Sequence, residues 1–458
     1  MPGRRLTAAF VVVLHFLTTL VNLRAESPAA KASNTTPSDQ AIQAEILRRA
    51  KLDFTLTPDQ LLAQLRESIP DVTAAEVTDW TKSGHLLHRT FDGDTFYFHN
   101  AVPNLFRTND EARNRRPHAP PAAKRFDLNG LVRRLVDEAE TALTPEIAPV
   151  HHRVRYELAI HDGHPLVKPG AKVRAWLPFP QEYRQQRNVK LISSDPPNGR
   201  IAPSTTPQRS IYFEHVVTDA AKAPRFQVEF EFTTSAYCPR LDPAAVKPYD
   251  PSSTLYREFT AERAPHILLT PEVRALAAEI VGDETNPLEK ARRIFHWVSK
   301  NIPWVSEMEY CTIPSLSAKG LQERCGDCGV QGLTFITLCR AAGVPARWQS
   351  GWGTKPGEEN MHDWSEIYID PYGWLPADAS YGVREDDDPR VRDFFCGRMD
   401  PYRLIVNLDY GRELDPPKTS FRSEPTDFQR GEVEIDGHNL YFNEWDYKFE
   451  VETTPSRN

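Results

Sequence analysis

The sequence predicts an α+β protein, because successive stretches of its 458 residues follow different hydrophobic periods. Residues 150–236 alternate apolar and polar side chains, which is typical of strands with one buried face. From Pro251 onward the apolar residues recur at helical spacing, and residues 431–452 return to alternation. We therefore expect a β-rich region, a region that contains the main helices, and a closing set of strands.

Composition excludes several classes of protein. The mean hydropathy of -0.53 does not fit a polytopic membrane protein. The formal charge of -8 is mild for this length, and no long Lys/Arg stripe is present to attract phosphate backbones. We expect a soluble body and no nucleic-acid partner.

The N-terminus has the pattern of an export signal. Arg4 and Arg5 precede a mostly apolar stretch from Leu6 to Leu23, and small Ala25 precedes Glu26. This pattern predicts a signal peptide over residues 1–25 and a secreted or periplasmic protein, with no stable membrane insertion after cleavage. If the segment is not cleaved, it would act as an anchor. Export would place the six cysteines where disulfides can form.

The organisation before the main helices is predicted in four parts. A linker at 26–40 leads to a small N-terminal α/β unit at 41–108, in which Thr57-Pro58-Asp59 opens a helix. A charged, proline-rich linker follows at 109–126. Residues 127–240 should hold one helix and an antiparallel β-sandwich-like domain.

Two further regions complete the chain. Residues 250–410 contain predicted helices that begin at Thr270-Pro271 and Asn286-Pro287. Residues 411–458 form a C-terminal β extension, with an Asp436-Gly437 hairpin turn. We expect this extension to complete a sheet.

The stretch most informative about chemistry is Cys325 to Arg347. Asp327 can cap a helix there, and Gly343 and Pro345 mark its end, so Cys328 falls in the first turn. Unpaired N–H groups and the positive end of the helix dipole stabilise a thiolate at that position. We expect Cys328 to be a nucleophile with a lowered thiol pKa.

A thiolate nucleophile needs a proton acceptor, and His362 is the best of the 14 histidines. It lies on an alternating strand, and Asp378 on the returning strand could orient its imidazole. A simple four-residue loop at 370–373 would place Asp378 opposite Ser365. We therefore expect a longer loop or a bulge.

These blocks together resemble the transglutaminase-like superfamily. Its pattern runs Gly-x-Cys, Arg-Ala-x-Gly-Val-Pro-Ala-Arg, His-x-Trp-x-Glu and Gly-Trp-x-x-x-Asp, and all four blocks occur here in order between Gly326 and Asp378. The resemblance implies a papain-like α+β core and a Cys-His-Asp triad at Cys328, His362 and Asp378. One departure is Asp363, because the residue after the histidine is commonly alanine; it could raise the histidine pKa or face solvent.

The resemblance also implies an oxyanion site made by the cysteine N–H and a second donor from upstream. Gln322, Trp304 and Trp297 are candidates for that donor. We expect no cofactor and no metal: a second paired-ligand motif for zinc is missing, and Glu385 to Asp388 lack the alternating spacing of calcium loops.

The expected function is cleavage or transfer at amide bonds through a thioester acyl-enzyme, as an amidase or protease, or as a protein-glutamine acyltransferase. The substrate would be a protein, a peptide or a peptidoglycan peptide. Two alternatives stay open: an inactive papain-like module that binds protein or glycan, and a thiol redox protein that uses Cys325 and Cys328.

Overall fold

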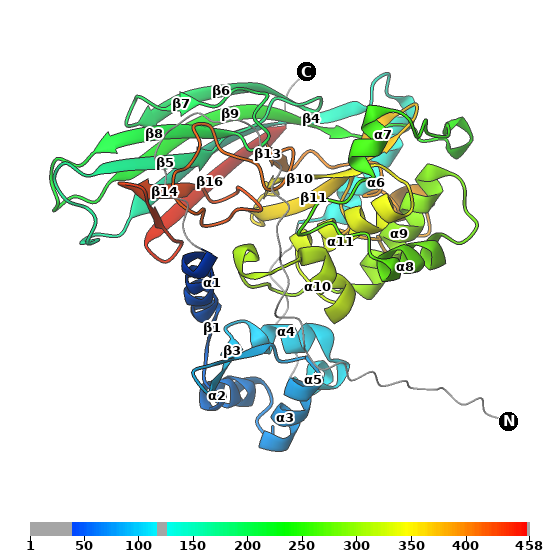
Figure 1. Cartoon of the computed structure of the whole chain (residues 1–458). Helices are drawn as coiled ribbons and strands as arrows, with labels where there is room; N and C mark the ends of the chain where they lie inside the picture. Colours follow the sequence, from blue (N-terminus) through cyan, green and yellow to red (C-terminus); the bar gives the residue numbers. More distant parts are fainter. Residues whose placement is uncertain (1–38, 117–125, 456–458) are drawn as a thin grey trace. The chain divides into compact units, whose positions relative to one another are not determined.

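The computed structural model describes residues 39–116 and 126–455 (Figure 1). The predicted signal peptide, most of the predicted linker at 26–40 and half of the predicted linker at 109–126 lie outside these ranges. Within them, no helix is both long enough and apolar enough to cross a membrane.

The N-terminal unit combines short helices with a small sheet. Its strands pair in the order β1-β3-β2. Thr57 begins α2 with the predicted cap: its hydroxyl accepts from the Gln60 N–H, and the Gln60 side chain accepts from the Thr57 N–H. The elements are α1 (Asp39–Asp53), β1 (Phe54–Leu56), α2 (Pro58–Ser68), α3 (Ala74–Lys82), β2 (His88–Phe91), β3 (Asp94–Phe98), α4 (Ala101–Thr108) and α5 (Asp110–Asn114).

A helix and a two-sheet β region follow, as the alternation predicts. The first part comprises α6 (Leu128–Thr141), β4 (Glu146–Ile160), β5 (Lys172–Pro178), β6 (Gln186–Asp195), β7 (Arg200–Ile201), β8 (Ser210–Val216) and β9 (Arg225–Tyr237). The end of the chain adds β14 (Glu432–Ile435), β15 (His438–Leu440) and β16 (Trp445–Pro455). The sheets have the orders β15-β14-β5-β8-β7 and β16-β4-β9-β6.

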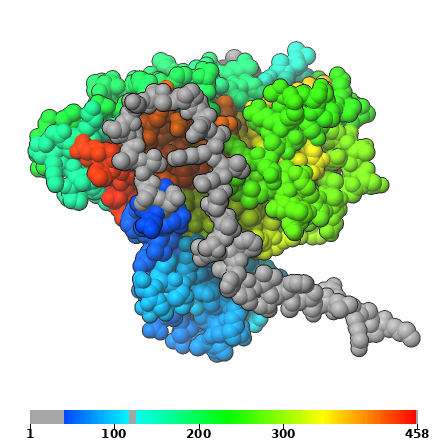
Figure 2. All heavy atoms as spheres, in the orientation of Figure 1, coloured from blue at the N-terminus to red at the C-terminus, as the bar shows by residue number. Residues whose placement is uncertain are grey.

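The C-terminal strands belong to both of these sheets. Strand β14 pairs antiparallel with β5, and β16 pairs antiparallel with β4 along its whole length. In Figure 2 the red atoms of the chain end lie directly against the green atoms of this β region. The extension predicted at 411–458 therefore completes two sheets, where the sequence led us to expect one.

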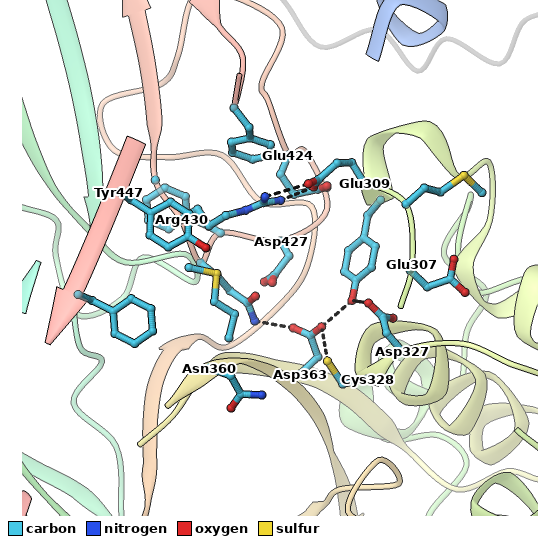
Figure 3. A pocket seen from close by; sticks show the side chains of 18 of the residues that line it. Glu307, Glu309, Asp327, Cys328, Asn360, Asp363, Glu424, Asp427, Arg430 and Tyr447 are labelled. Atoms are coloured by element: carbon cyan, nitrogen blue, oxygen red, sulfur yellow. Dashed lines mark hydrogen bonds and ion pairs between the residues drawn. The ribbon is translucent and has the colours of Figure 1, made fainter. Parts of the chain in front are cut away.

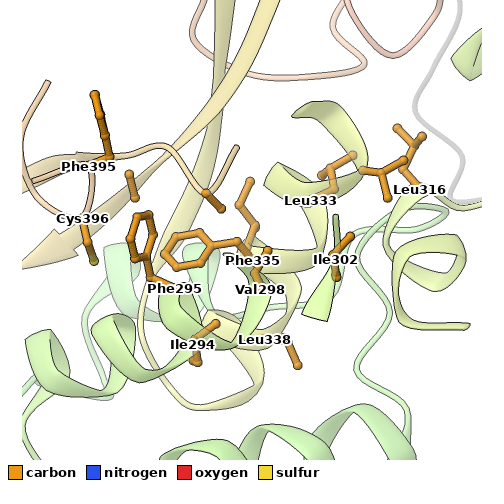
Figure 4. Packing of buried hydrophobic residues seen from close by; sticks show 14 of the residues in the cluster. Ile294, Phe295, Val298, Ile302, Leu316, Leu333, Phe335, Leu338, Phe395 and Cys396 are labelled. Carbon is orange, nitrogen blue, oxygen red and sulfur yellow. The ribbon is translucent and has the colours of Figure 1, made fainter. Parts of the chain in front are cut away.

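The helical region packs around a fourth sheet, of order β12-β11-β10-β13. Helix α11 (Cys328–Ala341) is buried along almost its whole length. The ring of Phe335 on this helix packs edge to face against the ring of Phe295 on α9 (Pro287–Asn301), and the two ring centroids are 6.4 Å apart (Figure 4). The elements are α7 (Thr254–Phe259), α8 (Pro271–Val281), α9 (Pro287–Asn301), α10 (Leu316–Glu323), α11 (Cys328–Ala341), β10 (Ala346–Gly353), β11 (Asn360–Ile369), β12 (Gly373–Ala377), α12 (Pro389–Arg392) and β13 (Arg403–Asn407).

Candidate active site

Cys328 is the first residue of α11, as predicted. Asp327 caps the helix, because its Oδ1 accepts from the Val330 N–H at 3.1 Å, and Gly343 ends it with a positive φ of 76°. Cys328 contributes to the wall of a cavity of about 470 Å³. The lining is rich in carboxylates and aromatic rings: Glu307, Glu309, Asp327, Glu359, Asp363, Glu424 and Asp427, with Trp304, Tyr310, Phe428, Phe442, Tyr447 and Phe449.

His362 and Asp378 form a buried pair. The imidazole Nε2 lies 2.7 Å from Asp378 Oδ2, and the two residues are 3% and 0% exposed. Arg403 donates to the same carboxylate oxygen at 2.8 Å. Burial lowers the pKa of His362 despite the nearby Asp378. Burial alone would raise the pKa of Asp378, but His362 and Arg403 hold it well below its usual range.

The hairpin that carries this pair differs from the expectation. Ile369 pairs with Gly373 and Ser365 pairs with Ala377, so the loop is 370–372 and the paired residues show no bulge. The expectation of a longer loop or a bulge is therefore wrong. Asp378 lies just beyond the end of β12, and its side chain reaches His362 diagonally, as neighbours across an antiparallel pair can.

Cys328 contacts Asp363, the residue next to His362. Its Sγ lies 3.3 Å from Asp363 Oδ2 (Figure 3). Side chains alternate across a strand, and Ser365 donates to the carbonyl of Gly332 in α11, so Asp363 and Ser365 share the face toward that helix. Among the hydrogen bonds of the described residues, none joins Sγ to the His362 ring. The structure thus brings His362 to Asp378 and brings Cys328 to Asp363.

Asp363 is the centre of a buried polar network. Its Oδ2 lies 2.8 Å from the Tyr310 hydroxyl, and its Oδ1 accepts from Gln429 at 2.7 Å. Asp427 lies beside it, and burial together with Asp427 and Asp327 raises the pKa of Asp363 well above its usual value. Asp363 is 2% exposed, so the expectation that it could face solvent is wrong.

The pKa of the Cys328 thiol also differs from the prediction. Burial, then the charges of Asp363 and Asp327, raise the pKa of the Cys328 thiol well above its usual value. The first turn of α11 does favour a thiolate, but desolvation and two carboxylates outweigh it. The expected lowering of the thiol pKa is therefore wrong for this arrangement.

The three upstream residues proposed as the second oxyanion donor lie in different places in the structure. Trp304 lines the cavity and is 39% exposed. Gln322 is exposed on α10 and is absent from the residues that line the cavity, and Trp297 lines a different surface hollow beside α9.

Sequence reasoning missed Tyr310 and Asp427. Neither belongs to a recognisable motif, and each is brought to Asp363 by folding alone. The one signal available was Asp363 itself, which departs from the alanine common in the family that the sequence resembles.

Cys325, the partner in the redox alternative, is half-buried, and burial raises the pKa of its thiol to about 11. All six cysteines lie in the described part of the chain, and each is free. Across residues 39–116 and 126–455, no group of three or more His, Cys, Asp or Glu side chains is arranged to hold a metal ion.

Comparison with known proteins supports the sequence resemblance. Residues 274–379 match the Transglutaminase-like superfamily. An uncharacterized protein of Haemophilus influenzae is 26% identical over 186 residues, 33% of this chain and 49% of that protein. The uncharacterized protein YebA of Bacillus subtilis is 27% identical over 133 residues, 25% of this chain and 18% of that protein. The chain thus spans half or less of the length of these relatives.

Solved structures with some similarity include a Cytophaga hutchinsonii protein described as a candidate cysteine protease. It is 16% identical with a TM-score of 0.45, over 68% of this chain and 91% of that one. The periplasmic domain of TgpA from Pseudomonas aeruginosa is 15% identical with a TM-score of 0.25, over 57% of this chain and 95% of that domain.

Proposed function

We propose that this chain is an exported cysteine enzyme that acts on amide bonds through a thioester, with Cys328 as nucleophile and His362 and Asp378 as its acid-base pair. The observation that carries the proposal is the position of Cys328, which opens a buried helix and lines a cavity of about 470 Å³. A buried His362–Asp378 pair on the neighbouring strands supports it. So does the match of residues 274–379 to the Transglutaminase-like superfamily.

In the proposed reaction, Sγ attacks the amide carbonyl carbon and its proton passes to His362. Nε2 of the ring is occupied by Asp378, so Nδ1 is the nitrogen left to exchange that proton. The imidazolium then protonates the leaving amine as the C–N bond breaks, and water or a second amine resolves the thioester. In the resting structure the thiol bonds to Asp363, and His362 projects from the opposite face of β11. This exchange therefore requires the thiol to leave Asp363 and a rearrangement that brings the imidazole to the sulfur.

The oxyanion of the tetrahedral intermediate would meet the Cys328 N–H at the start of α11, because the Gly329 and Val330 N–H groups donate to Tyr310 and Asp327. Trp304 is the candidate for a second donor, because it lines the cavity that Cys328 also lines. Resolution by water would make the protein an amidase or protease, and we favour that outcome over acyl transfer to an amine. Proteins, peptides and peptidoglycan peptides are the proposed substrates.

The test labels the protein with an electrophilic thiol probe and maps the modified peptide in the wild type, Cys328→Ala and His362→Ala. A matched control is His296→Ala, because His296 also pairs with a carboxylate, Asp393, at 2.7 Å but lies outside the Cys328 cavity. We expect labelling of Cys328 that weakens in His362→Ala and is unchanged in His296→Ala.

Turnover is measured on a peptide-amide library, with and without an added primary amine. We expect hydrolysis that is lost in Cys328→Ala, and mass spectrometry of the products separates hydrolysis from transamidation. Labelling at another cysteine, or turnover that survives in Cys328→Ala, would contradict the proposal. Substrate binding without any turnover in the wild type would favour the binding module instead.

A further inference from the structure

The resting thiol of Cys328 has a carboxylate as its partner, and this carboxylate is held in place on several sides. Asp363 Oδ2 takes the thiol contact at 3.3 Å, Oδ1 accepts from Gln429, and Tyr310 meets Oδ2 at 2.8 Å. Gln429 also donates to the His362 carbonyl at 3.0 Å, which ties the same side chain to the strand. The Asp363 carboxylate therefore has little freedom to turn away from the sulfur.

Counting protons shows that the network holds at least one extra proton. The Tyr310 hydroxyl has a single hydrogen, yet it lies 2.8 Å from both Asp327 Oδ2 and Asp363 Oδ2, and it also accepts from the Gly329 N–H. It can donate to only one of the two carboxyls. The other must be protonated and donate to the hydroxyl oxygen, so one of these two acids carries a proton in this arrangement.

The charged groups that face the sulfur are negative. Asp327 comes from the start of α11, Asp363 from β11 and Asp427 from the loop before β14, with Glu424 further along the same wall. Among the described residues that line the cavity, Arg430 is the one cationic side chain, and it bonds twice to Glu309. Behind the wall, Lys319 pairs with Glu307 and with Glu323.

We propose that Asp363 is a positioning residue for the nucleophile: its carboxyl group holds the Cys328 sulfur by a hydrogen bond and, when it is ionised, opposes loss of the thiol proton. The inference rests on the proposed role of Cys328. It adds a residue that acts on the nucleophile directly, next to His362 in the chain and on the opposite face of β11. Attack then begins from a thiol that must leave Asp363.

The direction of the expected change in the thiol pKa follows from the charge of the neighbouring carboxylate. A carboxylate beside a thiol disfavours the thiolate, so it moves thiolate formation to higher pH. Asp363→Asn keeps an oxygen that can accept from the thiol, but it cannot acquire a charge next to the sulfur as the pH rises, while Asp327 remains. Thiolate formation should therefore move to lower pH, and with it the alkylation of Cys328, because the thiolate is the reacting form.

The experiment measures the rate of Cys328 alkylation by iodoacetamide from pH 5 to pH 10, with peptide mapping. In this reaction the S–C bond forms, iodide leaves and the thiol proton passes to solvent. We expect the profile of Asp363→Asn to lie about one pH unit below that of the wild type, which is about a tenfold faster rate at a fixed pH on the rising limb. Asp387→Asn, in the acidic loop away from this cavity, should match the wild type.

Thermal unfolding is measured for each variant first. Asp363→Ser, also uncharged and smaller, is a second variant in case Asp363→Asn does not fold. An unchanged profile, or one moved to higher pH, in the variants that fold would overturn the inference. Alkylation needs no substrate, so this failure is distinct from the failure of the proposed function, which is turnover that survives in Cys328→Ala.

Discussion

The carboxylate of Asp378 interacts with two buried side chains: the Arg403 guanidinium and the His362 imidazole, which is a cation when it is protonated. Its Oδ2 meets the His362 imidazole at 2.7 Å and Arg403 at 2.8 Å, while Arg403 also pairs with Asp400 at 2.9 Å. Buried charges are tolerated when they are paired and hydrogen-bonded in this way. The arrangement fixes Nε2 of the ring and leaves Nδ1 for chemistry.

Replacing Asp378 with Asn should therefore impair catalysis more than it impairs folding. Arg403 keeps Asp400, but the imidazole loses the charge that favours its protonated form. We expect kcat to fall by about 10²–10⁴-fold, the usual contribution of acid-base catalysis. Steady-state kinetics and thermal unfolding measure the two effects. Asp393→Asn, at the partly buried His296–Asp393 pair, is the control. A kcat within twofold of the wild type in Asp378→Asn would contradict the assignment.

Helix α11 positions Cys328 through its cap. Asp327 Oδ1 accepts from the Val330 N–H, which satisfies one of the free donors of the first turn. Its Oδ2 meets Tyr310, so one side chain joins the helix start to the polar network around Asp363. Burial raises the pKa of Asp327 to about 6.

Two substitutions distinguish the contribution of the helix cap to stability from the contribution of the Asp327 charge. Asp327→Asn keeps an acceptor for the Val330 N–H, whereas Asp327→Ala removes it. We expect Asp327→Ala to lower the free energy of unfolding by about 1 kcal/mol, the usual worth of a helix cap, and Asp327→Asn to lower it by clearly less. Denaturant unfolding measures both. Equal losses in the two variants would show that the charge, and not the cap, is what stabilises the helix start.

At the scale of the whole molecule, the N-terminal unit holds one wall of the Cys328 cavity. Asn104 of α4 donates to the Ser306 carbonyl at 2.8 Å and accepts from its N–H at 2.9 Å. Asp53 accepts from the Glu309 N–H at 3.0 Å, and Arg107 lies over the Trp304 ring at 4.2 Å. Trp304 and Glu309 line the cavity, so the unit's contacts fix the segment from which they project.

Asn104→Ala should loosen this wall. It leaves both main-chain groups of Ser306 without their partner, at a cost of about 1–3 kcal/mol for each group that stays unsatisfied. We expect faster hydrogen exchange in residues 304–309 and a raised KM, with kcat changed little. Asn114→Ala, at an exposed position of α5, is the control. Exchange in 304–309 equal to that of the wild type would show that the segment is held without the N-terminal unit.

Much of the fold could be predicted because its signals are local. The period of two located the strands of the β region, and the cap residues Thr57, Asp327 and Asn286 located the starts of α2, α11 and α9. The His362–Asp378 contact was also anticipated, since both residues lie on one hairpin. The prediction of a longer loop or a bulge was wrong, because it assumed that Asp378 must lie directly opposite His362. A side chain can also reach a diagonal neighbour on the paired strand, and loop length alone does not show this.

The sequence by itself determined the strand and helix periods, the position of Cys328 at a helix start and the four motif blocks that resemble the transglutaminase-like superfamily. Only the tertiary structure decided which side chain meets the sulfur. Asp363, Tyr310 and Asp427 come from three segments of the chain that folding brings together beside the sulfur. Burial and the charges of Asp363 and Asp327 raise the thiol pKa against the local effect of the helix. Local pattern sets the backbone, but the pKa of a buried group depends on every charge that folding brings near it.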